Sequence, residues 1–205
     1  MFSMLLVTSF VSSQALRQGN FVIDPYYGFP NFGKSLMNSL EVEDGSNSVG
    51  GLGPWGLRIE YMAGDRFGIT LDGIHNSTSL SARYKPDFIY NEDGDYVQNT
   101  ENVEYEDKIA MNRIRIQVGL NYHFDFSDPS LDAFLGFAAG TNSRTWSFDS
   151  TNPEFNQPEN EFGVLIPVSL RLRLGGRYYF NDFLGINFEL GLGGPVLSAG
   201  LSVKI

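Results

Sequence analysis

The chain has 205 residues, a formal net charge of −10, 23 glycines, 14% aromatic residues and no cysteine. The lack of cysteine excludes disulfides and cysteine-based metal sites. The acidic balance argues against nucleic acid as a partner, because phosphate binding needs a basic surface. The sequence holds no run of 18 apolar residues, so it predicts no transmembrane helix.

Residues 1–15 are predicted to be a secretory signal peptide. They have a short apolar centre and small residues at Ser13 and Ala15 that suit cleavage. The alternative is that this stretch forms a buried first strand. With the signal removed, residues 16–205 are expected to form a single domain.

Beyond residue 15 the dominant pattern is alternation with a period of two. In one stretch Ile114, Ile116 and Val118 share a face, whereas Arg113 and Arg115 share the other. The sequence therefore predicts an all-β chain of eight antiparallel strands. The expected strands are residues 20–28, 54–63, 66–82, 106–124, 131–148, 162–180, 183–192 and 195–205.

The connections between these strands alternate in length. Residues 63–66, 125–130 and 181–182 are short, and the long, acidic connections are residues 29–53, 85–105 and 149–161. Short turns at one end and long loops at the other predict an up-and-down transmembrane β-barrel. With an even number of strands, both termini are expected on the side of the short turns, which is the periplasmic side.

Aromatic residues flank the short turns on the apolar face of the strands. Rings at these positions are expected to form a girdle in the lipid headgroup layer. The predicted girdle residues are Tyr61, Phe67, Tyr122, Phe124, Tyr178 and Phe180.

The opposite, polar face combines glycines with long charged side chains. This combination suits a narrow interior, so we expect the polar face to line the lumen and to fill it. Bases outnumber acids there, so the lumen is either net positive or also includes Asp24 and Asp132. A soluble, lipocalin-like barrel is the alternative, with its apolar face inward around a ligand. The predicted lumenal charges are Arg58, Glu60, Asp72, Arg113, Arg115, Arg171, Arg173, Arg177, Glu189 and Lys204.

The last strand alternates regularly up to the final residue. Its pattern of Ser198, Gly200, Val203 and Ile205 resembles the C-terminal assembly signal of Gram-negative outer-membrane barrels, although Ile205 replaces the usual Phe or Tyr. Together with residues 19–28 and 175–185, it resembles the small outer-membrane β-barrel family. This family includes the membrane domain of outer-membrane protein A and related porin-like barrels.

The resemblance implies a place in the outer membrane of a Gram-negative bacterium, with the termini in the periplasm and no cofactor. It implies contact with outer-membrane lipid and lipopolysaccharide, and with the barrel-assembly machinery during insertion. We expect a structural or interaction protein with a filled lumen. Its acidic extracellular loops would meet an extracellular or envelope protein partner.

Two residue groups suggest weaker alternatives. His75 and Ser77 share one strand face, and lipid A deacylase barrels use a His-x-Ser pair; a third catalytic member cannot be assigned here. The closely spaced acids around Asp93 and Asp95 are candidate calcium ligands, although an EF-hand spacing is incomplete. We therefore expect neither catalysis nor a bound metal.

The third and fourth strands are longer than a membrane requires. Residues 105–124 would span roughly 65 Å at about 3.3 Å per residue. The excess is expected to protrude outward. There its edge either shields the barrel or captures an extended partner by strand addition.

Overall fold

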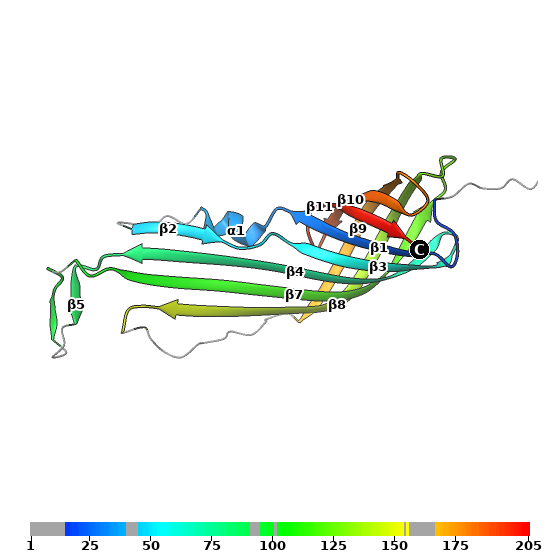
Figure 1. Cartoon of the computed structure of the whole chain (residues 1–205). Coiled ribbons are helices and arrows are strands. Elements are labelled where there is room, and N and C mark those ends of the chain that lie inside the picture. The colour runs from blue at the N-terminus through cyan, green and yellow to red at the C-terminus, as the bar shows by residue number, and fades with distance from the viewer. Residues whose placement is uncertain (1–14, 40–44, 91–94, 101, 154, 156–166) are drawn as a thin grey trace, which may run out of the picture.

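The protein folds into one long sheet that closes on itself at one end and continues as an open sheet at the other (Figure 1). This computed structural model describes all residues except 1–14, 40–44, 91–94, 101, 154 and 156–166. The C-terminus lies at the closed end, away from the open sheet (Figure 1).

Eight antiparallel strands form the closed ring, which confirms the predicted fold class. Each ring strand pairs with its neighbours in the chain, and the first ring strand pairs with the last. The ring strands are β1 (Phe21–Phe29), β3 (Trp55–Gly64), β4 (Phe67–Tyr84), β7 (Tyr105–Phe124), β8 (Leu131–Ser150), β9 (Val168–Tyr179), β10 (Leu184–Leu192) and β11 (Leu197–Lys204).

Pairing between β1 and β11 closes the ring. The amide of Phe21 donates to the carbonyl of Ile205 at 2.9 Å, and the Ile205 amide returns a bond of 2.8 Å. Further along, Gly200 lies opposite Tyr26 and Ser198 opposite Gly28. The last residues of the chain therefore supply the backbone hydrogen-bond partners of β1, so that the ring has no free edge at this seam.

The open sheet is the outward continuation of three ring strands. β4 pairs with β7 along its whole length, and β8 follows β7 to Ser150, whereas β9 reaches β8 only as far as Thr141. A ninth strand, β2 (Gly45–Gly50), pairs with the outer part of β4. We call this four-stranded sheet of β2, β4, β7 and β8 the extension (Figure 1).

Two small elements accompany the extension. Helix α1 (Phe32–Met37) begins after Asn31, whose side chain accepts a hydrogen bond from the Lys34 amide, as helix-capping residues do. The hairpin of β5 (Phe88–Tyr90) and β6 (Tyr96–Gln98) lies at the far tip (Figure 1). Among the described residues, no helix is long and apolar enough to cross a membrane.

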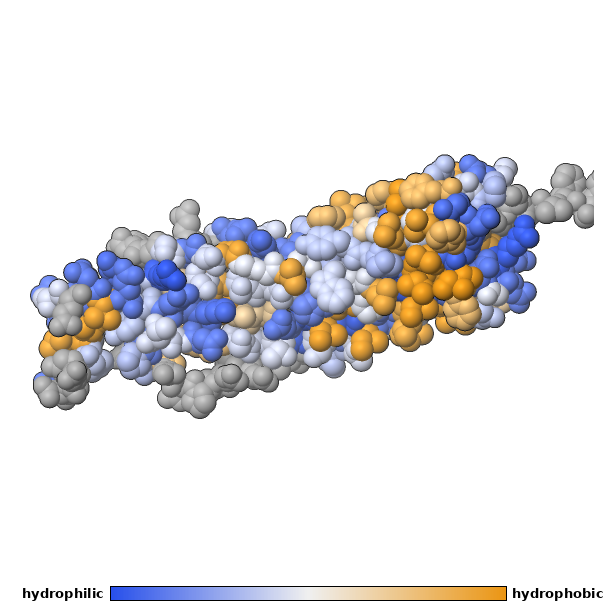
Figure 2. Space-filling view, in the orientation of Figure 1, coloured by the Kyte–Doolittle hydropathy of each residue, from blue (hydrophilic) through white to orange (hydrophobic). Residues whose placement is uncertain are grey.

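Apolar side chains of the ring point outward, and charged ones point inward. Leu57, Val118 and Leu172 are 45–60% exposed, whereas Arg171 and Arg173 are each 1% exposed. Figure 2 shows the apolar surface gathered over the ring, with a more polar surface on the extension. This arrangement is the inverse of a soluble ligand-binding barrel, whose apolar face would point inward.

The ring strands begin and end within two residues of the predicted positions wherever they are described. The predicted strand 162–180 begins at Val168, and residues 162–166 lie outside the described residues. The predicted loops differ more, because residues 29–53 contain α1 and β2, and residues 85–105 contain β5 and β6. β2 has almost no apolar alternation, so only its pairing with β4 identifies it as a strand.

Ring closure predicts that an added methyl group is tolerated very differently at two glycines. A Cβ at Gly200 would overlap the backbone carbonyl of Pro25, whereas a Cβ at Gly176 would have its nearest neighbour at 3.6 Å. Gly200→Ala is therefore expected to destabilise the barrel by about 1–3 kcal/mol relative to Gly176→Ala. Urea unfolding in detergent measures the difference, and equal stability of the two variants would contradict the described closure.

Candidate functional site in the barrel lumen

The part of the lumen nearest the short turns is organised around Arg177. Its guanidinium lies 2.7 Å from Asp24, 2.5 Å from Glu60 and 2.7 Å from Asp132. His123 links two of these carboxylates, at 2.7 Å from Asp132 and 3.0 Å from Glu60. All five side chains are buried, so they stabilise one another in place of solvent.

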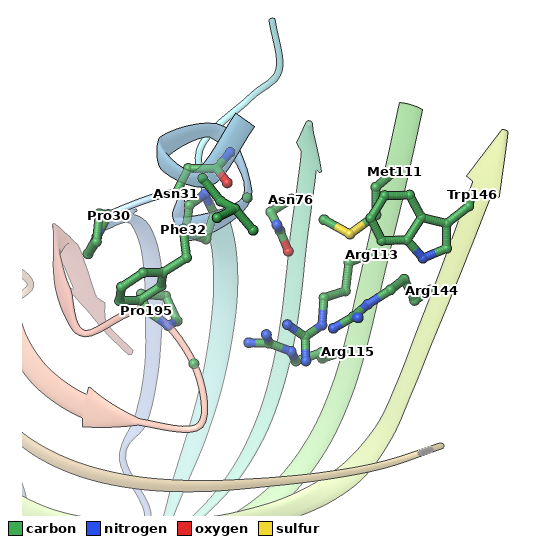
Figure 3. A pocket seen from close by; sticks show the side chains of 14 residues that line it. Pro30, Asn31, Phe32, Asn76, Met111, Arg113, Arg115, Arg144, Trp146 and Pro195 are labelled. Atoms are coloured by element: carbon green, nitrogen blue, oxygen red, sulfur yellow. The ribbon is translucent and has the colours of Figure 1, made fainter. Parts of the chain in front are cut away.

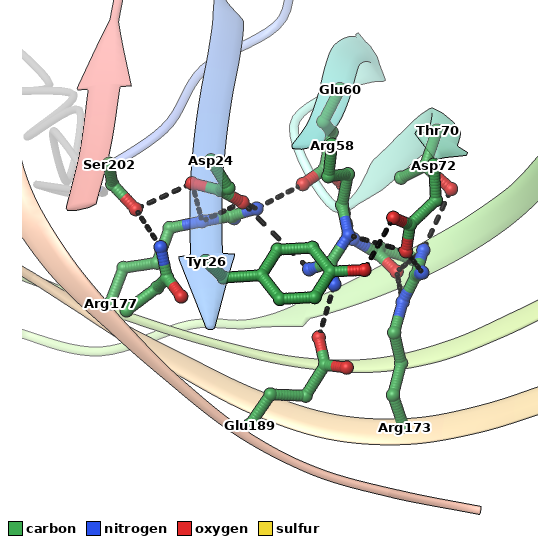
Figure 4. A network of polar contacts seen from close by, with 12 residues as sticks. Asp24, Tyr26, Arg58, Glu60, Thr70, Asp72, Arg173, Arg177, Glu189 and Ser202 are labelled. Carbon is green, nitrogen blue, oxygen red and sulfur yellow. Dashed lines mark hydrogen bonds and ion pairs between the residues drawn. The ribbon is translucent and has the colours of Figure 1, made fainter. Parts of the chain in front are cut away.

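The middle of the lumen is organised around Asp72. Its carboxylate lies 3.4 Å from Arg58, 3.0 Å from Arg171 and 3.2 Å from Arg173, and it accepts a hydrogen bond of 2.7 Å from Tyr26. These residues come from β1, β3, β4 and β9, so the network crosses the barrel (Figure 4). Such contacts lock together strands that do not pair with one another.

Charges in these two layers nearly balance. Glu189 completes the set by binding Arg58 at 2.5 Å and by pairing with Arg171. Five carboxylates thus face four arginines and one histidine. We call these ten side chains the lumenal network: Asp24, Glu60, Asp72, Asp132, Glu189, Arg58, Arg171, Arg173, Arg177 and His123.

Three more arginines form a separate layer at the outer mouth. Arg113 and Arg115 are two residues apart on β7, and Arg144 lies directly opposite Arg113 on β8. Among the described residues, none of these three arginines forms an ion pair with a carboxylate. Arg113 Nε donates to Asn142 Oδ1 at 2.7 Å. We call Arg113, Arg115 and Arg144 the arginine layer (Figure 3).

The arginine layer is electrostatically unlike the lumenal network. On the outward face of β7, Ile114 is followed toward the extension by the exposed polar residues Asn112 and Lys108, so Arg113 lies just beyond the apolar band. Partial burial and the neighbouring Arg144 guanidinium lower the pKa of Arg113. This direction reflects first the removal of the guanidinium from water and second the like charge of Arg144 beside it.

Lys204, the last of the predicted lumenal charges, lies near the opposite end. Its Nζ donates to the carbonyl of Ala15 at 2.9 Å and stands 4.8 Å from the ring centroid of Tyr179. It therefore contacts the start of the described chain and lies apart from the lumenal network.

The predicted girdle residues lie on the outward face around the short-turn end of the ring. Phe67 and Tyr122 have ring centroids 5.4 Å apart, and Tyr178 and Phe180 are 5.8 Å apart. Tyr61 contacts Phe21 at 4.8 Å, while Phe124 contacts Tyr122 at 5.4 Å. All six predicted residues expose between 37% and 58% of their surface.

The candidate catalytic pair, His75 and Ser77, lies on β4. The His75 ring lies 5.5 Å from that of Trp55, and Ser77 Oγ accepts a hydrogen bond from the Leu52 amide at 3.2 Å. No hydrogen bond between His75 and Ser77 is present in the described part of the chain. Asp93 lies outside the described residues, and within them no group of three or more potential metal ligands includes Asp95.

Sequence reasoning left several of these residues unassigned. The predicted lumenal charges do not include Tyr26, His123 or Arg144, although alternation places each on the inward face: Tyr26 with Asp24 on β1, His123 with Arg115 on β7, and Arg144 with Asp132 on β8. The signal was therefore present in the period of two. It was obscured because tyrosine and histidine stand out less than arginine or a carboxylate as members of a charge network. Arg144 was obscured because the opposite face of β8 carries Thr141 and Ser143 there, so the apolar alternation has ended.

These features define a transmembrane β-barrel that resembles the small eight-stranded outer-membrane barrels. The sequence matches no family model and no curated protein. Among solved structures, it is similar to Ail, the attachment invasion locus protein of Yersinia pestis, in complex with the heparin analogue sucrose octasulfate. That match has 10% identity and a TM-score of 0.42, and covers 91% of this chain and 96% of Ail.

A second similar structure is the outer membrane protein OprG from Pseudomonas aeruginosa. It has 12% identity and a TM-score of 0.40, with 92% of this chain and 97% of OprG covered. Both identities and TM-scores are low. The class of transmembrane β-barrel is therefore assigned from this chain's own ring closure, outward apolar face and inward charges.

The lumenal network predicts a large difference between buried and exposed carboxylates. Asp72→Asn removes a charge that three buried arginines share, so we expect a loss of about 3–5 kcal/mol in unfolding free energy. Asp125→Asn, beside the exposed Arg66, is the matched control and should cost far less, because solvent screens this surface pair. Urea unfolding in detergent micelles compares them, and a similar small loss in both would refute a structural role for the network.

Proposed function

We propose that this protein is a non-enzymatic, integral barrel of the outer membrane of a Gram-negative bacterium that presents its extension to partners. The observation that carries the proposal is the outward apolar band around the ring, from which a continuous sheet extends into water. A band of this kind requires lipid. Both the barrel and the extension use β4, β7 and β8, so the membrane anchor supports the display surface directly.

The surroundings of the barrel follow from this placement. Outer-membrane lipid and lipopolysaccharide would contact the apolar band, and the aromatic girdle would lie at its periplasmic boundary. The barrel-assembly machinery would recognise β11, with Ser198, Gly200, Val203 and Ile205 as its signal. Nucleic acid is not an expected partner, because the net charge is −10.

The tip of the extension is the favoured surface for a protein partner in the envelope or outside the cell. Phe88, Tyr90, Tyr96 and Phe155 are each 48–63% exposed there. Phe88 and Tyr96 stack with ring centroids 5.4 Å apart. Clustered aromatic rings with polar surroundings are typical of protein-binding surfaces.

Catalysis is not part of the proposal. The His75 ring packs beside Trp55, and Ser77 is engaged by a backbone amide, so neither residue is arranged as a base and nucleophile. This arrangement favours a structural or interaction role over the lipid A deacylase alternative.

The proposed topology predicts which ends of the barrel reagents can reach. The chain has no cysteine, so single substitutions can be labelled selectively. An impermeant maleimide should label Gln98→Cys at the tip on intact cells, and should label Asp182→Cys in a short turn only after the outer membrane is opened. Labelling of Asp182→Cys on intact cells would reverse the proposed orientation.

A detergent-extracted chain that migrates identically with and without boiling in SDS would refute the membrane barrel itself.

The lumenal network predicts that the barrel does not conduct like an open pore. Buried arginines and carboxylates cross the lumen at two levels, so hydrated ions have no free path. Planar bilayer recordings should show no steady conductance at the level of a diffusion porin. A sustained, large conductance from the wild-type protein would contradict the filled lumen.

A further inference from the structure

The arginine layer lines a cavity of about 310 Å³ at the outer mouth of the barrel. One wall is formed by β7 and β8, which continue outward into the extension; we call it the tall side of the mouth. The other wall, the low side, is formed by residues 30–33 after β1 and by the short turn between β10 and β11. In Figure 3 the three guanidinium groups gather at one side, while Phe32 and Pro195 lie across from them.

The positive charge of this layer is not balanced within the described chain. All five carboxylates of the lumenal network are already occupied by its own arginines and His123. Arg113 and Arg144 lie directly opposite each other across two strands, which is a destabilising position for like charges. Arg115 is 7% exposed, and its Nε has no hydrogen-bond partner within the described residues.

A bound anion supplies what this arrangement lacks. The guanidinium group presents several donors in a planar fork that matches the oxygens of a phosphate. The Nε atoms of Arg115 and Arg144 are both buried, and neither has a hydrogen-bond partner in the part of the chain that the structure describes. A phosphate monoester carries a charge of about −1.5 to −2 at neutral pH, so it compensates more of the layer than a single carboxylate does.

The remaining wall of the cavity is apolar. Met111 and Trp146 form the next pair outward from Arg113 and Arg144, and Phe32 and Pro195 line the low side. A site with a few convergent cations and an apolar wall suits an ester whose phosphate is attached to a larger body. Free inorganic phosphate would leave that wall in contact with water.

We propose that the outer mouth of the barrel is a binding site for a phosphate monoester carried by a sugar or a lipid headgroup. Arg113, Arg115 and Arg144 hold the phosphate, and Trp146 and Phe32 contact the body of the ester. The site goes beyond the proposed display function, because it requires no partner at the tip of the extension. A lipid of the outer leaflet and a soluble sugar phosphate are two sources of the same chemical group.

Trp146 provides a direct readout. The chain has only two tryptophans, and Trp55 lies on the outward face of β3, so a Trp55→Phe variant reports on the cavity alone. Refolded barrel in a polyoxyethylene detergent is titrated with glucose 6-phosphate, with glucose as the control. We expect a saturable change in Trp146 emission with glucose 6-phosphate only.

The decisive comparison uses two triple variants with the same change in charge. Replacing Arg113, Arg115 and Arg144 by glutamine should weaken the apparent affinity at least tenfold. The control also uses glutamine, at the exposed cations Arg66, Arg83 and Lys85 of the short-turn end and the extension. It should retain the wild-type affinity. Both must still shift on boiling in SDS, so that a lost site is distinguished from a lost barrel.

A last arm identifies the source of the phosphate. In phosphatidylcholine nanodiscs, added monophosphoryl lipid A should compete with glucose 6-phosphate if a lipid headgroup enters from the membrane. Unchanged affinity assigns the site to soluble esters, and both results retain the phosphate site. The proposal is overturned if glucose 6-phosphate produces no saturable change, if glucose produces an equal one, or if the arginine variant binds as tightly as the control.

Discussion

Closure of the sheet between β1 and β11 is the constraint on which the rest of the structure depends. Lipid offers no hydrogen-bond partner to a free strand edge, so every ring strand must find two neighbours. Phe21 and Ile205 exchange backbone bonds at this seam, and Gly200 lets β1 approach. Once the ring is closed, the period of two sends one face of each strand to lipid and the other into a narrow lumen.

The narrow lumen limits which side chains can fill it. Eight strands leave room only for side chains, and those on the polar face are long and charged. Arg177 and Asp72 each collect partners from several strands, so the ion pairs connect distant parts of the ring. This charge balance ends at the outer mouth. There Arg113 meets Arg144 instead of a carboxylate, and the change from a balanced to an unbalanced layer separates a structural interior from a candidate ligand site.

The unequal height of the barrel wall gives this mouth its shape. β4, β7 and β8 continue well beyond the apolar band, whereas β10 and β11 turn back early at residues 193–196. The arginine layer lies on the tall wall and faces the low one. The same extension carries exposed aromatic rings at its tip, so one structural feature supports two surfaces. One is a mouth close to the membrane, and the other is a display surface far from it.

The sequence alone determined the class of fold and the position of the ring strands, because alternation is a local property that survives folding unchanged. It also placed Arg58, Asp72 and Arg177 on the polar face. Only the tertiary structure decided the partners, because Arg177 meets Asp24 across 153 residues of chain and no local pattern encodes that distance. For the same reason β2 escaped prediction, because only its pairing with β4 identifies it as a strand. The arginines divide into a neutralised network and a layer without carboxylate partners among the described residues, and this division likewise depends on which strands become neighbours.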